Sequence, residues 1–277
     1  MAELTIEVTN NCGNRCVHCS SCALFEWDLQ GADDERSSSE QIYLLTLPEV
    51  KQVLDENSQF EMVRFSGGEP FMHPLILEFL REAKIRGKQT EVLSSGVYYR
   101  ERHIPSILSL CGRQFVDRIG FSLYGNSKVH AQVTRNDQAF EEFDETVNEV
   151  LENKIPFNFN FVCMSPTKDY LEETFQYVAS KQNSFCNPSI NFLRLVRQGN
   201  CRDDLALSRE EIDKLIGEAK TFSAKYSVPV NFGCSLEESF CRAGKGKRVF
   251  TYRKEYLDCS ALKYSSGGSK FRCSERW

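Results

Sequence analysis

Apolar and polar residues alternate along residues 3–9, and this period of two predicts a β-strand near the start of the chain. From residue 47 onward, short apolar runs alternate with longer segments in which apolar positions recur every three or four residues, as in an amphipathic helix. Further strands are predicted over 62–66, 90–94, 116–123, 157–164 and 190–196. Helices are predicted over 47–56, 75–86, 102–110, 140–153, 170–181 and 209–226.

Residues at the helix ends support several of these boundaries. Pro48 stands in the first turn of the first helix, where its missing N–H breaks no helical hydrogen bond. Gly87 follows the second helix, and Ser208 precedes the last one as a plausible N-cap. The stretch 30–41, rich in Asp, Glu and Ser, is typical of a surface loop.

Six strands that alternate with helices of this length predict an α/β fold with parallel pairing and right-handed crossovers. An open doubly wound sheet and a curved, partly closed barrel both fit, and periodicity does not separate them. After about residue 227 the alternation ends, and short apolar pieces lie among cysteine, glycine and basic residues. This indicates a small Cys-rich C-terminal subdomain that is organised by something other than a hydrophobic core.

The composition adds limits on function. The chain has 277 residues, of which 41% are hydrophobic and 26% charged, as in an ordinary globular protein. A net charge of -5 argues against a nucleic-acid partner, which would require a strongly basic surface. No apolar run approaches the roughly 20 residues that span a bilayer, and residues 1–8 lack the features of a signal peptide. We therefore expect a cytoplasmic protein without a membrane partner.

Twelve cysteines are many for a cytoplasmic chain. Without an export signal, disulfides are not expected, and clustered thiols more often bind metal or perform chemistry. Isolated cysteines in apolar surroundings, such as Cys111 and Cys163, are expected in the core.

Three of the thiols are closely spaced in Cys12-Gly-Asn-Arg-Cys16-Val-His-Cys19, directly after the first strand. Iron–sulfur clusters are held by cysteines spaced in this way. Three protein ligands leave one iron open to a substrate or cofactor. Catalytic zinc sites likewise keep one coordination position open. A structural zinc site with His18 or Cys22 as fourth ligand also fits the spacing, as does chance clustering in a Cys-rich chain.

The run from Glu7 through Cys19 resembles the CxxxCxxC signature of the radical S-adenosylmethionine (SAM) superfamily, including the strand before it. A second segment, Gly67-Gly68-Glu69-Pro70, resembles the GGEP motif of the same family and follows the strand at 62–66. Alone, GGEP would indicate only a strand-to-helix turn, but two motifs in the right order are more specific. The resemblance covers roughly residues 3–200 and implies a partial (β/α)6 barrel, which we place at residues 1–205.

The resemblance implies a 4Fe-4S cluster on Cys12, Cys16 and Cys19, with SAM bound to the open iron. An external one-electron reductant of flavodoxin or ferredoxin type then supplies an electron, and the bond from the SAM sulfur to the 5′ carbon breaks homolytically. The resulting 5′-deoxyadenosyl radical removes a hydrogen atom from a small-molecule or peptide substrate. The cofactor supplies the difficult chemistry, and the protein orients it.

SAM contacts are implied at the carboxyl ends of the strands. Gly67 and Gly68 allow the backbone to approach the methionyl group, Glu69 offers acceptors to its ammonium group, and Pro70 stiffens the exit from the strand. The other SAM-binding residues implied are His18 beside the adenine, Ser95 and Ser122 near the ribose or carboxylate, Arg135 at the carboxylate, and Asn160 and Val196 on later strands. An ordinary turn at Ser122 and a solvated side chain at Arg135 are the simpler alternatives.

The C-terminal cysteines resemble a further feature of the family. Cys241-Arg-Ala-Gly-Lys and Cys259-Ser-Ala-Leu-Lys resemble the twitch and SPASM extensions, which bind auxiliary iron–sulfur clusters. We expect residues 206–277 to form such a subdomain with one auxiliary 4Fe-4S cluster, because so small a segment lacks apolar residues for its own core. The expected ligands are Cys241, Cys259 and Cys273, with Cys234 as the candidate for a fourth. The glycine that usually precedes the second cysteine and a later close cysteine pair are both absent, so zinc or no metal stays open.

Two functions therefore follow from the sequence. The first is a radical SAM enzyme that modifies a small molecule or peptide by oxidation or bond formation. The second is a zinc-stapled, non-catalytic binding protein. Anaerobically purified protein would be brown in the first case and colourless in the second.

Overall fold

The computed structural model describes residues 2–24, 41–97, 114–233, 236 and 246–262. Within these ranges the strands form one sheet in the order β7-β6-β5-β4-β3-β2-β1-β8-β9. Neighbouring strands are parallel, except for the antiparallel pair of β8 and β9. The strands are β1 (Glu3–Thr9), β2 (Met62–Gly67), β3 (Gln89–Ser94), β4 (Arg118–Ser122), β5 (Phe157–Cys163), β6 (Ile190–Arg194), β7 (Val230–Phe232), β8 (Lys247–Phe250) and β9 (Tyr256–Leu257).

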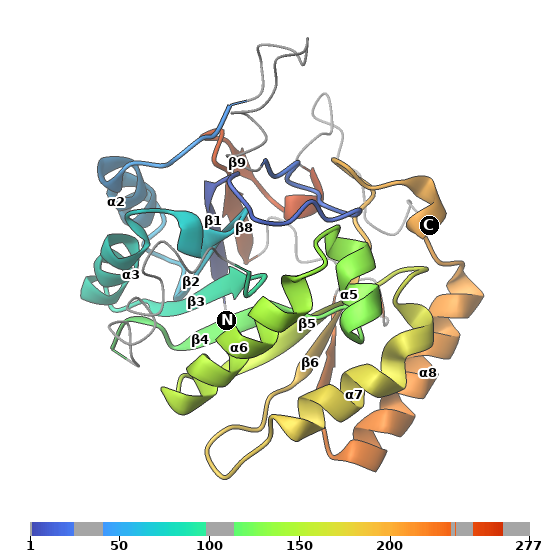
Figure 1. Cartoon of the computed structure of the whole chain (residues 1–277). Helices are drawn as coiled ribbons and strands as arrows, with labels where there is room; N and C mark the ends of the chain where they lie inside the picture. The colour runs from blue at the N-terminus through green and yellow to red at the C-terminus, as the bar shows by residue number, and fades with distance from the viewer. Residues whose placement is uncertain (1, 25–40, 98–113, 234–235, 237–245, 263–277) are drawn as a thin grey trace.

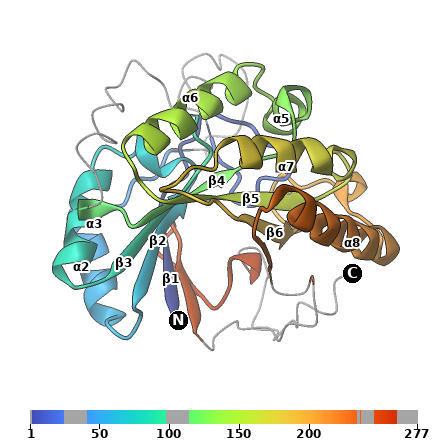
Figure 2. The ribbon, with the colours of Figure 1, turned by 90° about the horizontal axis from the view of Figure 1, so that it is seen from below.

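Helices cover the outer face of this curved sheet (Figures 1 and 2). They are α2 (Leu47–Glu56), α3 (Ile76–Ile85), α5 (Ser127–Thr134), α6 (Ala139–Glu152), α7 (Leu171–Ser180) and α8 (Arg209–Tyr226). Figure 2 shows α2, α3, α6, α7 and α8 along one arc, with the strands inside it. A doubly wound sheet would carry helices on both faces. The structure therefore confirms the α/β fold and favours the partial barrel over the open sheet.

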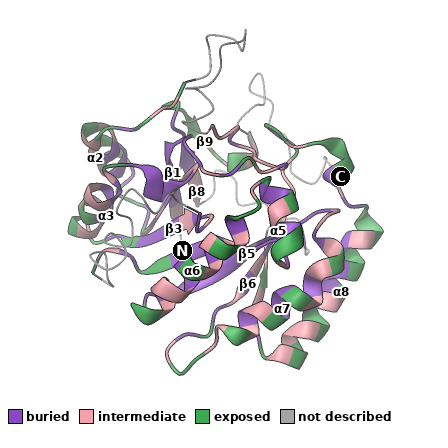
Figure 3. Ribbon diagram, in the orientation of Figure 1, coloured by how far each residue is buried: buried purple, intermediate pink, exposed green. Residues whose placement is uncertain are grey.

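The core lies between the outer face of the sheet and the inner faces of the helices. Phe159 of β5 packs against Phe143 of α6 and Tyr177 of α7, with ring centroids 6.1 and 5.8 Å apart. Phe143 and Phe159 are fully buried. Figure 3 shows the strands largely buried, whereas exposed residues gather on the solvent side of α7 and α8. Burial of these rings explains why the 3.6-residue pattern of the sequence located the helices.

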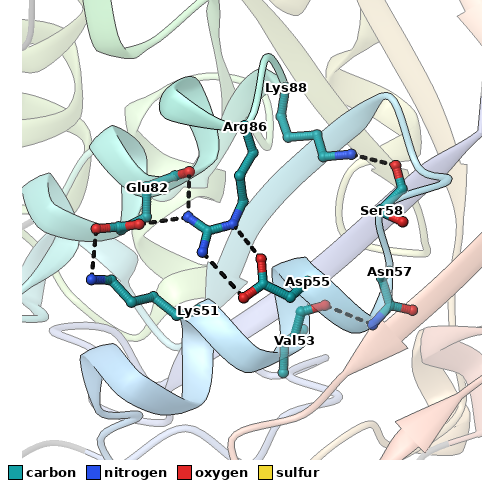
Figure 4. A network of polar contacts seen from close by, with 8 residues as sticks. All are labelled: Lys51, Val53, Asp55, Asn57, Ser58, Glu82, Arg86 and Lys88. Carbon is teal, nitrogen blue, oxygen red and sulfur yellow. Dashed lines mark hydrogen bonds and ion pairs between the residues drawn. The ribbon is translucent and has the colours of Figure 1, made fainter.

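The solvent sides of α2 and α3 are joined by a group of ion pairs (Figure 4). Arg86 lies 2.7 Å from Asp55 and 2.5 Å from Glu82, and Glu82 lies 3.0 Å from Lys51. Ion pairs that stay in contact with solvent, as these partly buried and exposed groups do, stabilise a protein by little individually. Here they link α2 to the end of α3.

Helix α5 was not predicted from the sequence. It is short, and its cap is Asn126, whose side chain accepts a hydrogen bond from the backbone N–H of Val129 at 3.1 Å. The helix ends at Arg135, which has a left-handed backbone conformation with φ of 53°. The helix expected over 102–110 lies outside the described residues.

The described part of residues 206–277 contributes strands to the same sheet. Its helix α8 packs against α7, with the rings of Phe222 and Phe175 5.9 Å apart. Strand β7 pairs with β6, and β8 pairs in parallel with β1. The boundary expected after residue 205 therefore does not separate two sheets in the described part of the chain. Strands as short as β7 and β8 leave no readable alternation, so they could not be predicted from the sequence. None of the helices in the described ranges is long and apolar enough to cross a membrane.

Candidate functional site

The loop after β1 carries the three closely spaced thiols. Cys12 is buried, and Cys16 and Cys19 are partly buried. The backbone N–H of Asn14 donates to Cys12 Sγ at 3.5 Å, and that of Ala23 donates to Cys19 Sγ at 3.4 Å. Hydrogen bonds to cysteine sulfurs are among the features that tune iron–sulfur clusters.

The thiols influence one another electrostatically. Burial raises the pKa of Cys12 well above its usual value, and the neighbouring Cys16 adds to this effect. Burial also raises the pKa of Cys16 to about 12, with a further contribution from Cys19. The protein alone thus disfavours thiolates here, whereas a bound metal centre would favour them, because a coordinating thiol is deprotonated outright.

Whether the three thiols hold an iron–sulfur cluster or a single ion depends on how closely they converge. In the part of the chain that the structure describes, no group of three or more His, Cys, Asp or Glu side chains is placed to hold one metal ion. Structural zinc needs four ligands around one point. A 4Fe-4S cluster binds each thiolate through a different iron, and its place on Cys12, Cys16 and Cys19 stays a prediction.

The GGEP segment packs directly against the cysteine loop. Gly68 N–H donates to the carbonyl of Thr9, and Glu69 N–H donates to that of Asn11, both at 2.7 Å. A Cβ on Gly67 would lie 2.2 Å from Thr9 O, and one on Gly68 would lie 2.2 Å from Asn11 O. Gly67 also has φ of 141°, which side chains rarely allow. In the structure, the missing side chains of these glycines leave room for the loop that carries Cys12. The close approach of their backbone to SAM stays a prediction.

The Glu69 carboxylate is fully buried and joins the ends of β2 and β3. One oxygen accepts from Ser94 Oγ at 2.9 Å and from the N–H of Phe71 at 3.2 Å. The other accepts from the N–H and the Oγ of Ser95 at 2.8 and 2.7 Å. Burial raises the pKa of Glu69, and these four donors lower it part of the way back. A carboxylate offers about four lone-pair sites, and four donors already use that number here. The expected contact with the SAM ammonium group therefore stays a prediction.

Pro70 begins a buried 3-10 turn, η1 (Pro70–Met72). The Glu69 side chain caps this turn through the N–H of Phe71. The turn therefore directs the chain away from β2 and toward α3.

His18 contacts Tyr124, a residue that no motif of the sequence pointed to. Its Nε2 lies 3.3 Å from the hydroxyl of Tyr124, and the two rings meet edge to face with centroids 5.2 Å apart. Burial lowers the pKa of His18 to about 4, so the imidazole is neutral near pH 7. Tyr124 is 5% exposed and follows β4. Its position two residues after Ser122, at a strand's carboxyl end, is the signal that could have identified it.

The end of α5 also contacts the cysteine loop. Arg15 N–H donates to the carbonyl of Thr134 at 2.9 Å, and Asn136 Nδ2 donates to Asn14 Oδ1 at 3.1 Å. Arg135 lies between these two contacts, and its side chain is exposed. The structure thus brings Arg135 to the edge of the site, and its role at the SAM carboxylate stays a prediction.

Ser122 and Asn160 are register partners on β4 and β5. Asn160 Oδ1 accepts from Asn191 Nδ2 at 3.0 Å, and Asn191 Oδ1 accepts from Asn231 Nδ2 at 3.0 Å. Alternate residues on β5, such as Phe159, pack under the helices. The row of amides therefore lies on the concave face of the sheet.

The segment after β6 covers Cys19. Val196 accepts from the N–H of Gln198 at 2.9 Å, and Asn200 N–H donates to the carbonyl of Cys19 at 2.9 Å. A Cβ on Gly199 would lie 2.4 Å from the same carbonyl oxygen. Val196 itself is only partly buried.

Part of the C-terminal segment reaches the same loops. Tyr252 donates its hydroxyl hydrogen to Ser21 O at 2.8 Å, and the side-chain amide of Gln198 donates to Ala261 O. Cys259 is partly buried, and its Sγ accepts from the N–H of Ala261 at 3.5 Å. The other expected auxiliary ligands, Cys234, Cys241 and Cys273, lie outside the described residues.

A family model described as the radical SAM superfamily matches residues 6–178, a span that includes both the cysteine loop and GGEP. The chain belongs to the radical SAM superfamily. Members are enzymes that use a 4Fe-4S cluster and SAM and that need a reductant and a substrate. The alternative of a non-catalytic zinc protein is therefore set aside. No curated protein sequence matches the chain.

Solved structures with a similar fold include SPASM-type radical SAM enzymes. SuiB of Streptococcus suis, bound to the precursor peptide SuiA, is 14% identical with a TM-score of 0.73, over 96% of this chain and 62% of that one. The enzyme anSMEcpe with bound AdoMet is 15% identical with a TM-score of 0.65, over 94% and 74%. The Escherichia coli coproporphyrinogen III oxidase HemN is 13% identical with a TM-score of 0.53, over 81% and 52%. The chain thus spans about 62% of the length of SuiB, and identities this low show a common fold alone.

Proposed function

We propose that this radical SAM enzyme cleaves SAM at a 4Fe-4S cluster held by Cys12, Cys16 and Cys19, and that it removes hydrogen from a small-molecule or peptide substrate. The proposal is carried by one observation. Backbone hydrogen bonds of 2.7 Å from Gly68 and Glu69 join the GGEP segment to the cysteine loop. A SAM molecule held by one motif would therefore lie beside the metal centre held by the other.

When bound, the cluster and SAM supply a one-electron cleavage that releases a 5′-deoxyadenosyl radical. The thiolates of Cys12, Cys16 and Cys19 would hold the cluster, and the N–H groups of Asn14 and Ala23, which donate to two of these sulfurs, would stabilise negative charge on them. The four donors around the Glu69 carboxylate hold the ends of β2 and β3 at a fixed separation, and Ser95 supplies two of them. This supports a role for Ser95 and the GGEP backbone in positioning SAM.

The remaining SAM contacts are proposals of the same kind. His18 is neutral and lies in the cysteine loop, where it suits packing beside the adenine. Arg135 is exposed at the edge of the site, where its guanidinium can reach a carboxylate. Ser122, Asn160 and Val196 lie at the carboxyl ends of their strands or just after them, the end at which parallel α/β folds bind ligands.

The substrate would enter from the concave face. The amides of Asn160, Asn191 and Asn231 give this face both donors and acceptors, which suits a polar substrate. A peptide substrate is in line with SuiB, whose structure contains a precursor peptide. The chain's polar concave face suits a small polar molecule equally well.

We propose an auxiliary 4Fe-4S cluster in the C-terminal segment, with Cys241, Cys259 and Cys273 as ligands and Cys234 as a fourth. It is supported by the contact between the Cys259 region and the segment that covers Cys19. Two clusters would give about eight iron atoms per chain, and Cys259→Ala would reduce this to about four. An unchanged iron content in Cys259→Ala contradicts this part of the proposal.

The central test is an anaerobic assay. Reconstituted protein is mixed with SAM and dithionite, and 5′-deoxyadenosine is measured by chromatography. Wild-type protein should form it, and the Cys12/Cys16/Cys19→Ala variant should form none. Cys163→Ala is the matched control, because Cys163 is a buried thiol of the outer core, with 1% exposure. Equal product from the triple variant and the wild type would rule out the assignment of these thiols.

A further inference from the structure

Two amide side chains come together over Gly120 on the concave face of the sheet. Gly120 is the register partner of Asn158, and Asn160 lies two residues further along β5 on the same face. A Cβ on Gly120 would lie 3.0 Å from Asn160 Nδ2 and 3.1 Å from Asn158 Oδ1. The missing side chain of Gly120 therefore lets a nitrogen and an oxygen approach the same point.

The oxygen at this point has no partner within the protein. Asn158 is 6% exposed, and its Oδ1 is buried without a hydrogen bond in the described structure. The Asn158 oxygen therefore lies beside Asn160 Nδ2 and does not accept from it. A buried polar atom without a partner lowers the free energy of unfolding, and native proteins keep few of them. On a face that suits a polar substrate, a ligand group that pairs with this oxygen explains why it is kept.

The row of amides defines the role of the nitrogen. Asn160 Oδ1 accepts from Asn191 Nδ2 at 3.0 Å, and Asn191 Oδ1 accepts from Asn231 Nδ2 at 3.0 Å. The oxygen of Asn160 is thereby used, and its Nδ2 is the end of the row next to Gly120. An amide nitrogen carries two hydrogens, so a contact with SAM through one of them leaves the other for this point. The point over Gly120 therefore faces one donor and one acceptor.

A donor beside an acceptor matches a ligand group that carries an acceptor beside a donor. Primary carboxamides and ring amides have their C=O and N–H on one edge, whereas an ordinary peptide group is trans and points them in opposite directions. Leu93, the register partner of Gly120 on β3, adds an apolar wall, since its Cδ2 lies 2.9 Å from the same Cβ position. These side chains are all uncharged, which suits an amide better than a carboxylate.

We propose that Asn158 and Asn160 bind an amide group of the substrate over Gly120, and that this group is a primary carboxamide or a ring amide. The proposal rests on the proposed function, because it concerns the substrate of that reaction. Gly120 precedes Ser122 by two residues on β4, so the amide lies about 6–7 Å deeper in the barrel than Ser122. It anchors the substrate below the level at which SAM is proposed to bind.

The test is the binding of small amides to the reconstituted, SAM-bound enzyme without reductant, measured by saturation-transfer NMR. The probes are 2-pyrrolidinone, a ring amide, and propionamide, a primary carboxamide. Two comparison compounds are cyclopentanone, which lacks the N–H, and N-methylacetamide, whose C=O and N–H are trans. We expect at least one probe to bind about tenfold more tightly than both comparison compounds, because each of these leaves one buried group unpaired. Probes that bind no more tightly than the comparison compounds overturn the proposal.

The two probes also separate the two sources of the amide. Preferred binding of 2-pyrrolidinone alone supports a ring amide, and preferred binding of propionamide alone supports a primary carboxamide. Preferred binding of both supports the shared amide chemistry.

Substitutions locate the binding. Asn158→Leu has a similar volume and removes the unpaired oxygen, so it should abolish the tenfold preference without lowering the midpoint of urea unfolding. Gly120→Ala places a methyl group at the point itself and should abolish binding of the probes. Asn148→Leu is the matched control, because Asn148 lies on α6 and donates to Asp144 at 3.1 Å, and it should keep the preference. A preference that survives in Asn158→Leu overturns the proposal.

The comparison of compounds on the wild type needs no variant, so it stays decisive when a variant fails to fold. A wild type that forms 5′-deoxyadenosine but shows no preference overturns this inference and leaves the proposed function intact. A lowered urea midpoint in Asn158→Leu, together with no preference in the wild type, assigns Asn158 a structural role instead. A wild-type protein that holds no iron or sulfide overturns both the proposed function and the inference.

Discussion

The buried carboxylate of Glu69 offers a direct test of how the site is held together, through the substitution Glu69→Gln. The carboxylate accepts four hydrogen bonds of 2.7–3.2 Å. Glutamine keeps one oxygen and replaces the other with an NH2 group, which cannot accept. The favourable orientation keeps the oxygen at Ser95 and turns the NH2 toward Ser94 and Phe71. The Ser94 hydroxyl can rotate to accept from it, but the N–H of Phe71 cannot.

The expected loss combines two effects. One buried donor remains unsatisfied, and two hydrogen bonds to a charged group become hydrogen bonds to a neutral one, for a total of about 2–4 kcal/mol. Burial opposes the charge on Glu69, as its raised pKa indicates, and removal of that charge recovers part of the loss. We therefore expect the lower half of this range, about 2–3 kcal/mol.

The assay is urea unfolding of the cluster-free protein, followed by circular dichroism. The matched control is Glu152→Gln at the exposed end of α6, which should change the free energy of unfolding by no more than about 0.5 kcal/mol. Ser95→Ala removes one of the four donors and should cost about 1 kcal/mol. If Glu69→Gln proved as stable as Glu152→Gln, the carboxylate would not join β2 to β3 as described.

Three further predictions follow from described contacts. Gly68→Ala brings a Cβ to 2.2 Å from Asn11 O, so it should lower the amount of iron bound after reconstitution. The control is Gly217→Ala in α8, which has open space around it and should bind as much iron as the wild type. In urea unfolding, Gly217→Ala should also stabilise the protein by about 0.5–1 kcal/mol. Tyr177→Phe loses its hydrogen bond to Asp144 and should cost about 1 kcal/mol by the same assay, and an unchanged midpoint in urea would contradict it. Burial alone would raise the pKa of Asp144, but hydrogen bonds from Lys181 and Tyr177 lower it overall. The stability that Asp144 contributes should therefore be present above pH 3.8 and lost as the pH falls toward the lowered pKa, and Asp144→Asn should flatten that part of a stability profile.

Long elements with a clear period could be predicted from the sequence. Strand β1 and helix α2 have the predicted bounds, and α8 begins directly after its Ser208 cap, whose side chain accepts from Glu211 N–H. Helix α5 was missed because it is short, with β-branched residues at several positions, and it is held by its cap and by the packing of Val129 and Val133. The cap and the i, i+4 pair of valines are local signals, but a segment of 8 residues carries too few of them to stand out from a loop.

The motifs predicted which segments meet at the site, and the contacts between those segments needed the structure. The role of Glu69 depends on Ser94 and Ser95, which lie 25 and 26 residues later on another strand. Tyr124 and His18 are 106 residues apart, so their contact appears only in three dimensions. Local sequence chemistry finds the groups that could bind a cofactor, but it cannot say which of them already have partners within the protein.

Strand β8 has a consequence for how the protein is made. It borders β1 on the side opposite β2, so the strand that leads into Cys12 has neighbours on both edges. Because β8 is synthesised long after β1, a growing chain on the ribosome leaves one edge of β1 open, and open edges invite wrong pairing. The strand that leads into the cysteine loop is therefore paired on both edges only after residues 247–250 have been synthesised.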